Sequence, residues 1–97
     1  MKRDDVARSL RQYKETNKDK YRIVKLGFFG SAARDSMKEE SDIDIVVELA
    51  EPDLFNLIGI KQDLEEELSR PVDIIRYRKK MNPFLKAKIE KEAIYVR

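Results

Sequence analysis

The segment at residues 42–48 constrains the fold more than any other part of the chain. Its sequence, Asp-Ile-Asp-Ile-Val-Val-Glu, first alternates between acidic and apolar residues and then becomes apolar. This pattern predicts a β-strand whose isoleucine side chains face a hydrophobic core. A chain of 97 residues has the length of one domain, so we expect residues 1–97 to fold as a unit around this strand.

Other apolar segments predict further strands. Strands are expected at 21–29 and 72–77, with a short extended segment at 94–96. The first of these contains too many apolar residues for a strand with one face in water, so both of its faces are expected to be covered.

Apolar residues recur at helical spacing in three segments, which are 3–17, 53–69 and 83–93. The polar run that begins at Asn17 is expected to end the first helix. Asn82 and Pro83 are expected to open the last one, because Asn is a good cap and Pro fits the first helical position.

The strand at 21–29 ends at Gly30. Ser31 is a plausible N-cap for a short helix at 31–34, and a charged loop is expected at 37–41. The expected order is helix, strand, short helix, strand, helix, strand, helix. This order predicts an α/β domain in which helices cover a small sheet.

Composition excludes several kinds of chemistry. The chain has no cysteine and no histidine, which rules out disulfides, thiolate metal sites, histidine zinc sites and serine–histidine catalysis. Charged residues make up 41% of the chain, yet the net charge is only +2, so no strong nucleic-acid binding is expected. No segment approaches the roughly 20 apolar residues of a membrane span, and we expect a cytoplasmic protein.

Asp42 and Asp44 stand at the start of the clearest strand. Residues two apart on a strand point to the same face, so the two carboxylates are expected side by side. Like charges in such a pair favour a cation between them, and a hard divalent ion is the natural partner. The alternative is that one Asp caps a turn and the other is solvated.

Gly30-Ser31 lies between a buried strand and the expected short helix. A glycine there lets a ligand approach the backbone, and free N–H groups beyond it favour an anion such as phosphate. The alternative is an ordinary strand-to-helix turn. Asp73 lies within the apolar strand at 72–77, where it either completes a carboxylate cluster with Asp42 and Asp44 or pairs with a neighbouring arginine.

Taken together, a phosphate turn and three carboxylates indicate phosphoryl transfer assisted by two metal ions. The motif Gly30-Ser31-Ala32-Ala33-Arg34, followed by Ser41-Asp42-Ile43-Asp44-Ile45, resembles the signature of the DNA polymerase β-like nucleotidyltransferase superfamily. Its length and spacing are most similar to the minimal nucleotidyltransferase (MNT) branch. The resemblance implies a small mixed sheet of about three to four strands covered by helices.

The resemblance also implies a role for each residue. Gly30 and Ser31 hold the β- and γ-phosphates of ATP, Asp42 and Asp44 bind two Mg²⁺ ions, and Asp73 binds the catalytic Mg²⁺ and accepts a proton. Arg34 either steadies the triphosphate or pairs with a carboxylate of the loop. Asp35 stands where the family often has glycine, which adds a negative charge near the expected phosphate site.

MNT proteins are partners of HEPN-domain toxins. The resemblance therefore implies an antitoxin that neutralises a HEPN toxin by transferring AMP from ATP to a tyrosine hydroxyl, within a hetero-oligomer of the two proteins. No direct nucleic-acid binding and no membrane contact are expected. Two alternatives stay open: an antitoxin that inhibits by binding alone, and a nucleotidyltransferase that acts on a small molecule.

Overall fold

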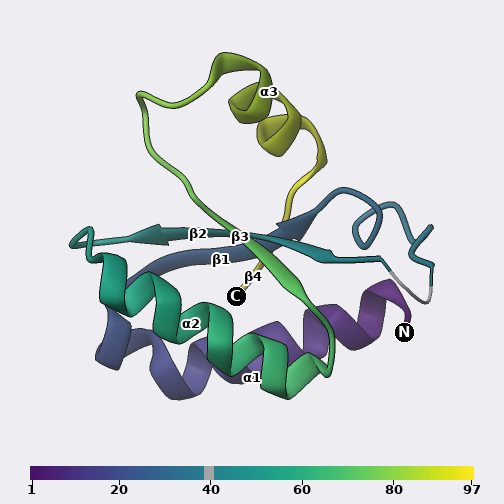
Figure 1. Cartoon of the computed structure of the whole chain (residues 1–97), viewed down its shortest axis with the longest axis horizontal. Helices are drawn as coiled ribbons and strands as arrows, with labels where there is room; N and C mark the ends of the chain where they lie inside the picture. The colour runs from purple at the N-terminus through teal and green to yellow at the C-terminus, as the bar shows by residue number, and fades with distance from the viewer. Residues whose placement is uncertain (39–40) are drawn as a thin grey trace.

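A four-stranded sheet lies at the centre of the computed structural model, which describes residues 1–38 and 41–97 (Figure 1). The strands are β1 (Ile23–Phe29), β2 (Ile43–Leu49), β3 (Val72–Arg76) and β4 (Ile94–Val96). Their order in the sheet is β3-β2-β1-β4. β1 runs antiparallel to β2 and β4, whereas β2 and β3 are parallel, so the sheet is mixed as expected.

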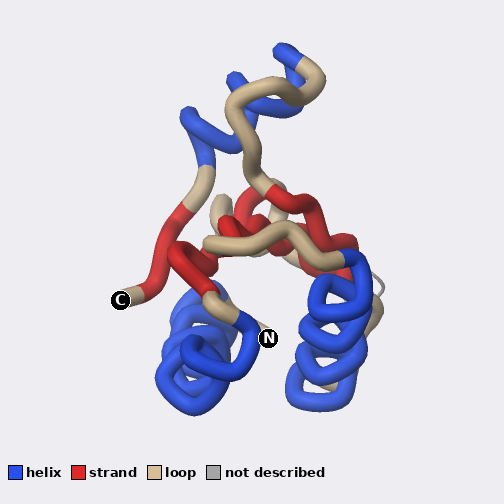
Figure 2. The backbone as a smooth tube through the Cα atoms, turned by 90° about the vertical axis from the view of Figure 1, so that its left-hand side faces the viewer, coloured by secondary structure: helices blue, strands red, loops and turns tan. Residues whose placement is uncertain are grey.

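Helices cover both faces of this sheet, and they are α1 (Arg3–Tyr21), α2 (Leu54–Leu68) and α3 (Pro83–Glu92). α1 and α2 lie side by side beneath one face, and α3 stands over the other face (Figure 2). This arrangement confirms the predicted α/β class. None of the helices among the described residues is long and apolar enough to cross a membrane.

Each face of the sheet has its own hydrophobic core. Leu10, Ile45 and Leu64 belong to the larger core, which α1 and α2 share with the sheet. Val46 and Ile89 belong to the smaller core under α3. Successive residues of β2 therefore enter different cores, which explains why its sequence becomes wholly apolar after the two aspartates.

Several predicted boundaries were wrong. The first helix does not end near Asn17 but continues to Tyr21, which is buried, and Arg22 in left-handed conformation caps it. As a result, the first strand begins at Ile23. The polar residues on which the predicted end relied lie on the solvent side, where a helix tolerates them.

The short helix predicted at 31–34 is instead a hydrogen-bonded turn at 30–35. The predicted charged loop at 37–41 includes residues 39 and 40, which lie outside the described part of the chain. The cap predicted for the last helix was correct, and α2 has a cap of the same kind. Asp53 accepts hydrogen bonds from two backbone N–H groups at the start of α2, and Asn82 does the same for α3, where Pro83 takes the first position.

A hydrogen bond between α1 and α2 gives a first testable prediction, on stability. The hydroxyl of Tyr13 donates to Oδ2 of Asp63 at 2.7 Å, and burial raises the pKa of Tyr13, so this hydroxyl stays protonated. Tyr13→Phe is expected to lower the free energy of unfolding by about 1–2 kcal/mol, because Asp63 loses the shorter of its two tyrosine hydrogen bonds. Thermal unfolding would show this as a fall in Tm of about 4–8 °C for each kcal/mol.

Tyr21→Phe is the matched control for Tyr13→Phe. The hydroxyl of Tyr21 lies 3.4 Å from the same Oδ2 of Asp63, which makes the weaker of the two hydrogen bonds. The control is expected to lose less stability. An equal loss for both variants would contradict the assignment of the helix contact to Tyr13.

Candidate active site

The turn after β1 is built around Gly30. Its φ is 69°, in the left-handed region, and its carbonyl accepts hydrogen bonds from the N–H groups of Ala33 and Arg34, both at 3.1 Å. A Cβ on this residue would collide with Oδ2 of Asp44. Glycine is therefore required both by the backbone conformation and by the close approach of the Asp44 carboxylate.

Ser31 follows Gly30 at the top of the turn and is partly exposed. Its carbonyl accepts a hydrogen bond from the N–H of Ser36 at 2.9 Å, which closes the turn. Among the described residues, no backbone carbonyl of a turn or loop accepts a hydrogen bond from the N–H of Ser31 or of Ala32. These two N–H groups and the Ser31 hydroxyl are the donors that this turn can offer to an anion.

The sheet brings the three predicted carboxylates to one end of β2 and β3. Asp42 precedes β2 and is exposed, and Asp44 is the second residue of β2 and partly buried. Asp73 is the register partner of Asp44 on the parallel strand β3, and Phe29 is its partner on β1. Neighbouring strands lie about 4.8 Å apart, so this register places the carboxylates of Asp44 and Asp73 close together.

The carboxylates of Asp44 and Asp73 belong to the face of the sheet that carries α3. Asp44 is two residues before Val46, which packs in the smaller core, and Asp73 is two residues before Ile75, which packs against that core. Since side chains two apart on a strand share a face, Asp44 and Asp73 face the α3 side. The turn at Gly30 lies beside them through the pairing of Phe29 with Asp44.

The electrostatics of Asp44 reflect this crowding. Burial raises the pKa of its carboxyl, and the negative charge of Asp73 and then that of Asp42 raise it further. The positive charges of Lys88 and Arg34 act in the opposite direction. The fold therefore holds Asp44 where its negative charge is disfavoured, which is the condition under which a cation is attracted.

The donor set suits Mg²⁺. Carboxylate oxygens are the ligands that hard divalent cations prefer, and Gly30 leaves the Asp44 carboxylate uncovered where a side chain would have blocked it. Among the described residues, no three acidic side chains are close enough together to hold one metal ion. The three aspartates share one end of the sheet without forming a closed metal cage, so their role as metal ligands stays a prediction.

The side chain of Arg34 is held by an ion pair and is not free to reach the carboxylates of the site. Its guanidinium forms a short ion pair with Glu92 at the end of α3. Of the two alternatives for Arg34, pairing with a carboxylate describes this structure, but the partner lies on α3 and not in the loop. The ion pair ties the turn after β1 to the helix above the sheet.

Asp35 adopts a left-handed backbone conformation, which glycine usually adopts. The φ of this residue is 57°. Its Oδ1 accepts a hydrogen bond from the backbone N–H of Arg3 at 3.0 Å. The negative charge of Asp35 is thus directed to the positive N-terminal end of α1.

Lys88 is a site residue that sequence reasoning missed. Its Nζ lies 6.0 Å from the ring centroid of Phe29, and its charge lowers the pKa of Asp44. No sequence pattern marks it, because α3 carries several lysines. Lys88 comes close to Phe29 and Asp44 only because α3 folds back over the sheet.

Known proteins resemble this chain in both sequence and fold. Residues 10–96 match the family model described as a nucleotidyltransferase domain. The chain belongs to the nucleotidyltransferase family. A Methanocaldococcus jannaschii protein provisionally named a protein adenylyltransferase is 38% identical over 93 residues, which cover 95% of each chain.

Several solved structures have the same fold as this chain. One, described provisionally as a minimal nucleotidyltransferase, is 30% identical with a TM-score of 0.79, covering 97% of this chain and 95% of its own. A toxin–antitoxin complex with AMP-PNP has a chain that is 22% identical with a TM-score of 0.75, covering 92% and 70%. A complex of a tri-AMPylated Shewanella oneidensis HEPN toxin with an MNT antitoxin gives a TM-score of 0.57 at 22% identity, covering 88% and 70%.

Proposed function

We propose that this nucleotidyltransferase is the antitoxin of a HEPN/MNT pair and transfers AMP from ATP to a tyrosine hydroxyl of its HEPN toxin. The observation that carries the proposal is the contact of Gly30 with Asp44, in register with Asp73. This contact supports the proposal because it brings a turn that can offer N–H donors next to two carboxylates. The relative provisionally named a protein adenylyltransferase and the AMPylated HEPN toxin complex support this choice of substrate.

The turn after β1 binds the triphosphate. Gly30 lets the β- and γ-phosphates approach the backbone, and Ser31 donates its hydroxyl to a phosphate oxygen. Arg34 holds the turn against α3 through Glu92, which makes it a positioning residue. Lys88, whose ammonium group lies above Phe29, supplies positive charge to the phosphates.

Asp42, Asp44 and Asp73 are the ligands that would hold two Mg²⁺ ions. When bound, Mg²⁺ would offset the charge of the phosphates and of the carboxylates themselves. The exposed carboxylate of Asp73 faces the acceptor and takes the proton of its hydroxyl. The hydroxyl oxygen then bonds to the α-phosphorus, and pyrophosphate leaves on the opposite side. With no histidine in the chain, a carboxylate is the natural proton acceptor.

The acceptor half of the reaction belongs to another protein. The net charge of +2 provides no long basic track for nucleic acid. A partner that brings its own tyrosine to the exposed end of β3 fits this open site. The active assembly is therefore a hetero-oligomer of antitoxin and toxin.

Intact-mass spectrometry tests this proposal. The chain is mixed with the HEPN protein encoded beside it, ATP and Mg²⁺, and the HEPN protein is weighed. We expect a mass gain of one or more AMP units, located on tyrosine by peptide mapping. An unchanged mass with correctly folded proteins would contradict the proposal.

Lys88→Ala is expected to raise the KM for ATP about tenfold or more, because a charge-assisted contact to phosphate is lost. Lys86→Ala is the matched control on the same helix, since Nζ of Lys86 instead donates to the carbonyl of Lys79 at 3.1 Å. Steady-state kinetics at varied ATP concentration would separate the two variants. Equal KM values for ATP would contradict a role of Lys88 in nucleotide binding.

A further inference from the structure

Among the residues that the structure describes, the outer edge of β3 has no strand partner, because β3 lies at one end of the order β3-β2-β1-β4. The N–H of Ile43 donates to the carbonyl of Pro71 at 3.0 Å, and the N–H of Tyr77 donates to the carbonyl of Val47 at 2.8 Å. The backbone groups of the odd-numbered residues from 71 to 77 therefore form hydrogen bonds with β2. Because backbone groups alternate in direction along a strand, those of Ile74 and Arg76 point outward.

One end of this edge is already covered. The outward N–H of Val72 donates to Oε2 of Glu65 on α2 at 3.0 Å. Within residues 1–38 and 41–97, no such acceptor is found for the N–H groups of Ile74 and Arg76. The open part of the edge therefore begins directly after Asp73.

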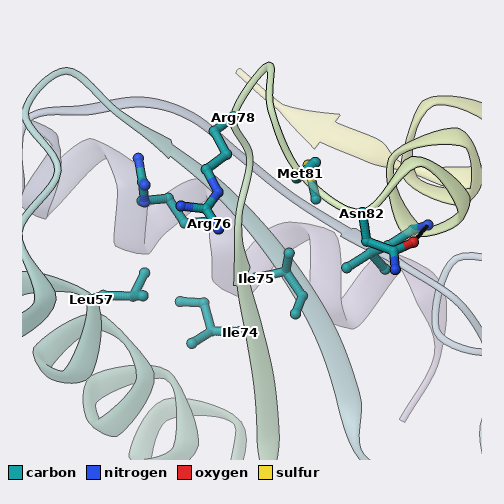
Figure 3. Close-up of a pocket in the computed structure, with 8 residues that line it drawn as sticks. Leu57, Ile74, Ile75, Arg76, Arg78, Met81 and Asn82 are labelled. Carbon is teal, nitrogen blue, oxygen red and sulfur yellow. Dashed lines mark hydrogen bonds between the residues drawn. The ribbon is translucent and has the colours of Figure 1, made fainter.

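A groove of about 380 Å³ follows this open edge (Figure 3). Leu57 and Ile74 line it on the α2 side, and Ile75 and Met81 line it on the side of the loop that leads to α3. Arg76 and Arg78 lie together at one end of it. The groove thus combines an apolar lining with unpaired backbone groups and two guanidinium groups.

The groove continues past Leu57 onto the start of α2. Leu54, which is 67% exposed, lines an adjoining hollow together with Leu57 and Arg76. Apolar side chains exposed beside an open strand edge are typical of a binding surface for another polypeptide.

The charge at the groove indicates the kind of polypeptide that binds. Arg76, Arg78, Lys79 and Lys80 are four basic residues within five positions, and among the described residues neither arginine takes part in an ion pair. We infer that the outer edge of β3 binds an extended, acidic segment of the protein substrate by strand addition. Main-chain hydrogen bonds to Ile74 and Arg76 provide affinity, and the arginines select acidic side chains.

This inference rests on the proposed function, since it assigns the docking site of the adenylylated protein. The open edge begins one residue after Asp73, which is about 3.3 Å along a strand. A substrate segment paired with β3 therefore passes the carboxylate that takes the acceptor proton. The same segment that docks on the edge can present its hydroxyl to the site.

Amide exchange measured by NMR tests strand addition residue by residue. The probe is the HEPN protein encoded beside this chain, added unlabelled to the ¹⁵N-labelled chain. We expect the amides of Ile74 and Arg76 to become at least about tenfold more protected in the complex, whereas Asp73 and Ile75, already bonded to β2, change little. A complex that leaves the amides of Ile74 and Arg76 unprotected would overturn the inference.

Charge reversal tests the choice of an acidic segment. Arg76→Glu combined with Arg78→Glu is expected to raise the KM for the HEPN protein by about tenfold or more and to leave ATP binding unchanged. Arg11→Glu, an exposed substitution on α1, is the control and should change neither. An unchanged KM for the double variant would overturn the inference. The inference would also be overturned if the amides of Ile74 and Arg76 became protected at high protein concentration without the HEPN protein. That result would assign the edge of β3 to a second copy of this chain.

The two proposals fail in distinguishable ways. If the native chain transfers no AMP to the HEPN protein, the proposed function fails. If it transfers AMP and the double arginine variant does so with the same KM, only the docking surface is wrong. An edge that RNA protects and the HEPN protein does not would also overturn the assignment to a protein segment.

Discussion

Asp44→Asn is expected to abolish AMP transfer and, at the same time, to make the fold more stable. Asp44 would help to hold the Mg²⁺ that supplies positive charge at the phosphates. The loss of rate should be on the order of 10³-fold or more, the size of effect seen when positive charge at a transferred phosphoryl is lost. The carboxylate of Asp44 lies against Gly30, which has no side chain to cover it. Asp73 is the register partner of Asp44 on the neighbouring strand. Asn keeps the shape of Asp44 and removes its charge.

The gain in stability follows from the raised pKa of Asp44. Burial, Asp73 and Asp42 disfavour its charge in the folded state. Because the folded state binds this proton more tightly than the unfolded state, the native chain loses stability as the pH rises from about 4 through the folded pKa. Asp44→Asn avoids this loss. Its advantage should therefore be absent below about pH 4 and complete above the folded pKa.

Thermal unfolding at several pH values, without Mg²⁺, measures this difference. We expect Asp44→Asn to be more stable at pH 7 by about 0.5–2 kcal/mol, with a Tm higher by about 4–8 °C for each kcal/mol. Asp53→Asn is a useful control, because Asn also caps helices well and Asp53 lies at α2 away from the site. Equal or lower stability of Asp44→Asn at pH 7 would contradict the charge crowding.

The same variant separates catalysis from simple binding. If the antitoxin inhibits only by occupying the toxin, Asp44→Asn should protect cells as well as the native chain. If it acts by AMP transfer, cells that express the toxin with Asp44→Asn should fail to grow. Full protection by this variant, combined with an unmodified toxin, would support the binding alternative.

Gly30→Ala is the second substitution with a large expected effect, about 10²-fold or more in AMP transfer. A Cβ at this position would occupy the place of Oδ2 of Asp44, and a φ of 69° is unfavourable for alanine. Either the turn or the carboxylate must move. We expect kcat to fall and the KM for ATP to rise together, because both the phosphate turn and the metal ligand are displaced.

Gly59→Ala is the matched control for Gly30→Ala. Gly59 lies in α2, where a Cβ would come 3.0 Å from the hydroxyl of Tyr21, a tight contact at the end of a side chain. Alanine also favours the helix by about 1 kcal/mol, which offsets that contact. AMP transfer by Gly59→Ala should equal that of the native chain. Native activity in Gly30→Ala would contradict the tight packing of the turn against Asp44.

The sequence predicted the strands better than the turns and helix ends. The strand at 42–48 was recognisable because Ile45 and Val46 enter different cores, and a strand covered on both faces must be apolar. The end of α1 was not recognisable, because Lys18 to Lys20 are exposed and such polar residues tolerate either a helix or a loop. What decides the matter is the burial of Tyr21 next to Asp63, a contact across 42 residues of sequence.

Candidate site residues on strands were easier to find than those on the covering helix. Asp42, Asp44 and Asp73 stand out because an acidic residue beside apolar strand residues needs a reason. Lys88 and Glu92 do not, because lysine and glutamate are ordinary on an exposed helix. Their roles depend on the loop after β3, which returns α3 over the sheet so that Glu92 meets Arg34. Sequence patterns within one element do not contain this information.

Label transfer from two forms of ATP tests the central claim most directly. The chain, the HEPN protein and Mg²⁺ are incubated with ATP labelled at the α-phosphate or, in parallel, at the γ-phosphate. An adenylyltransferase places the α-label on the HEPN protein, releases the γ-label as pyrophosphate, and does neither after Asp44→Asn. Transfer of the γ-label to the protein, or α-label transfer that survives Asp44→Asn, would contradict the proposed role of the carboxylates beside Gly30.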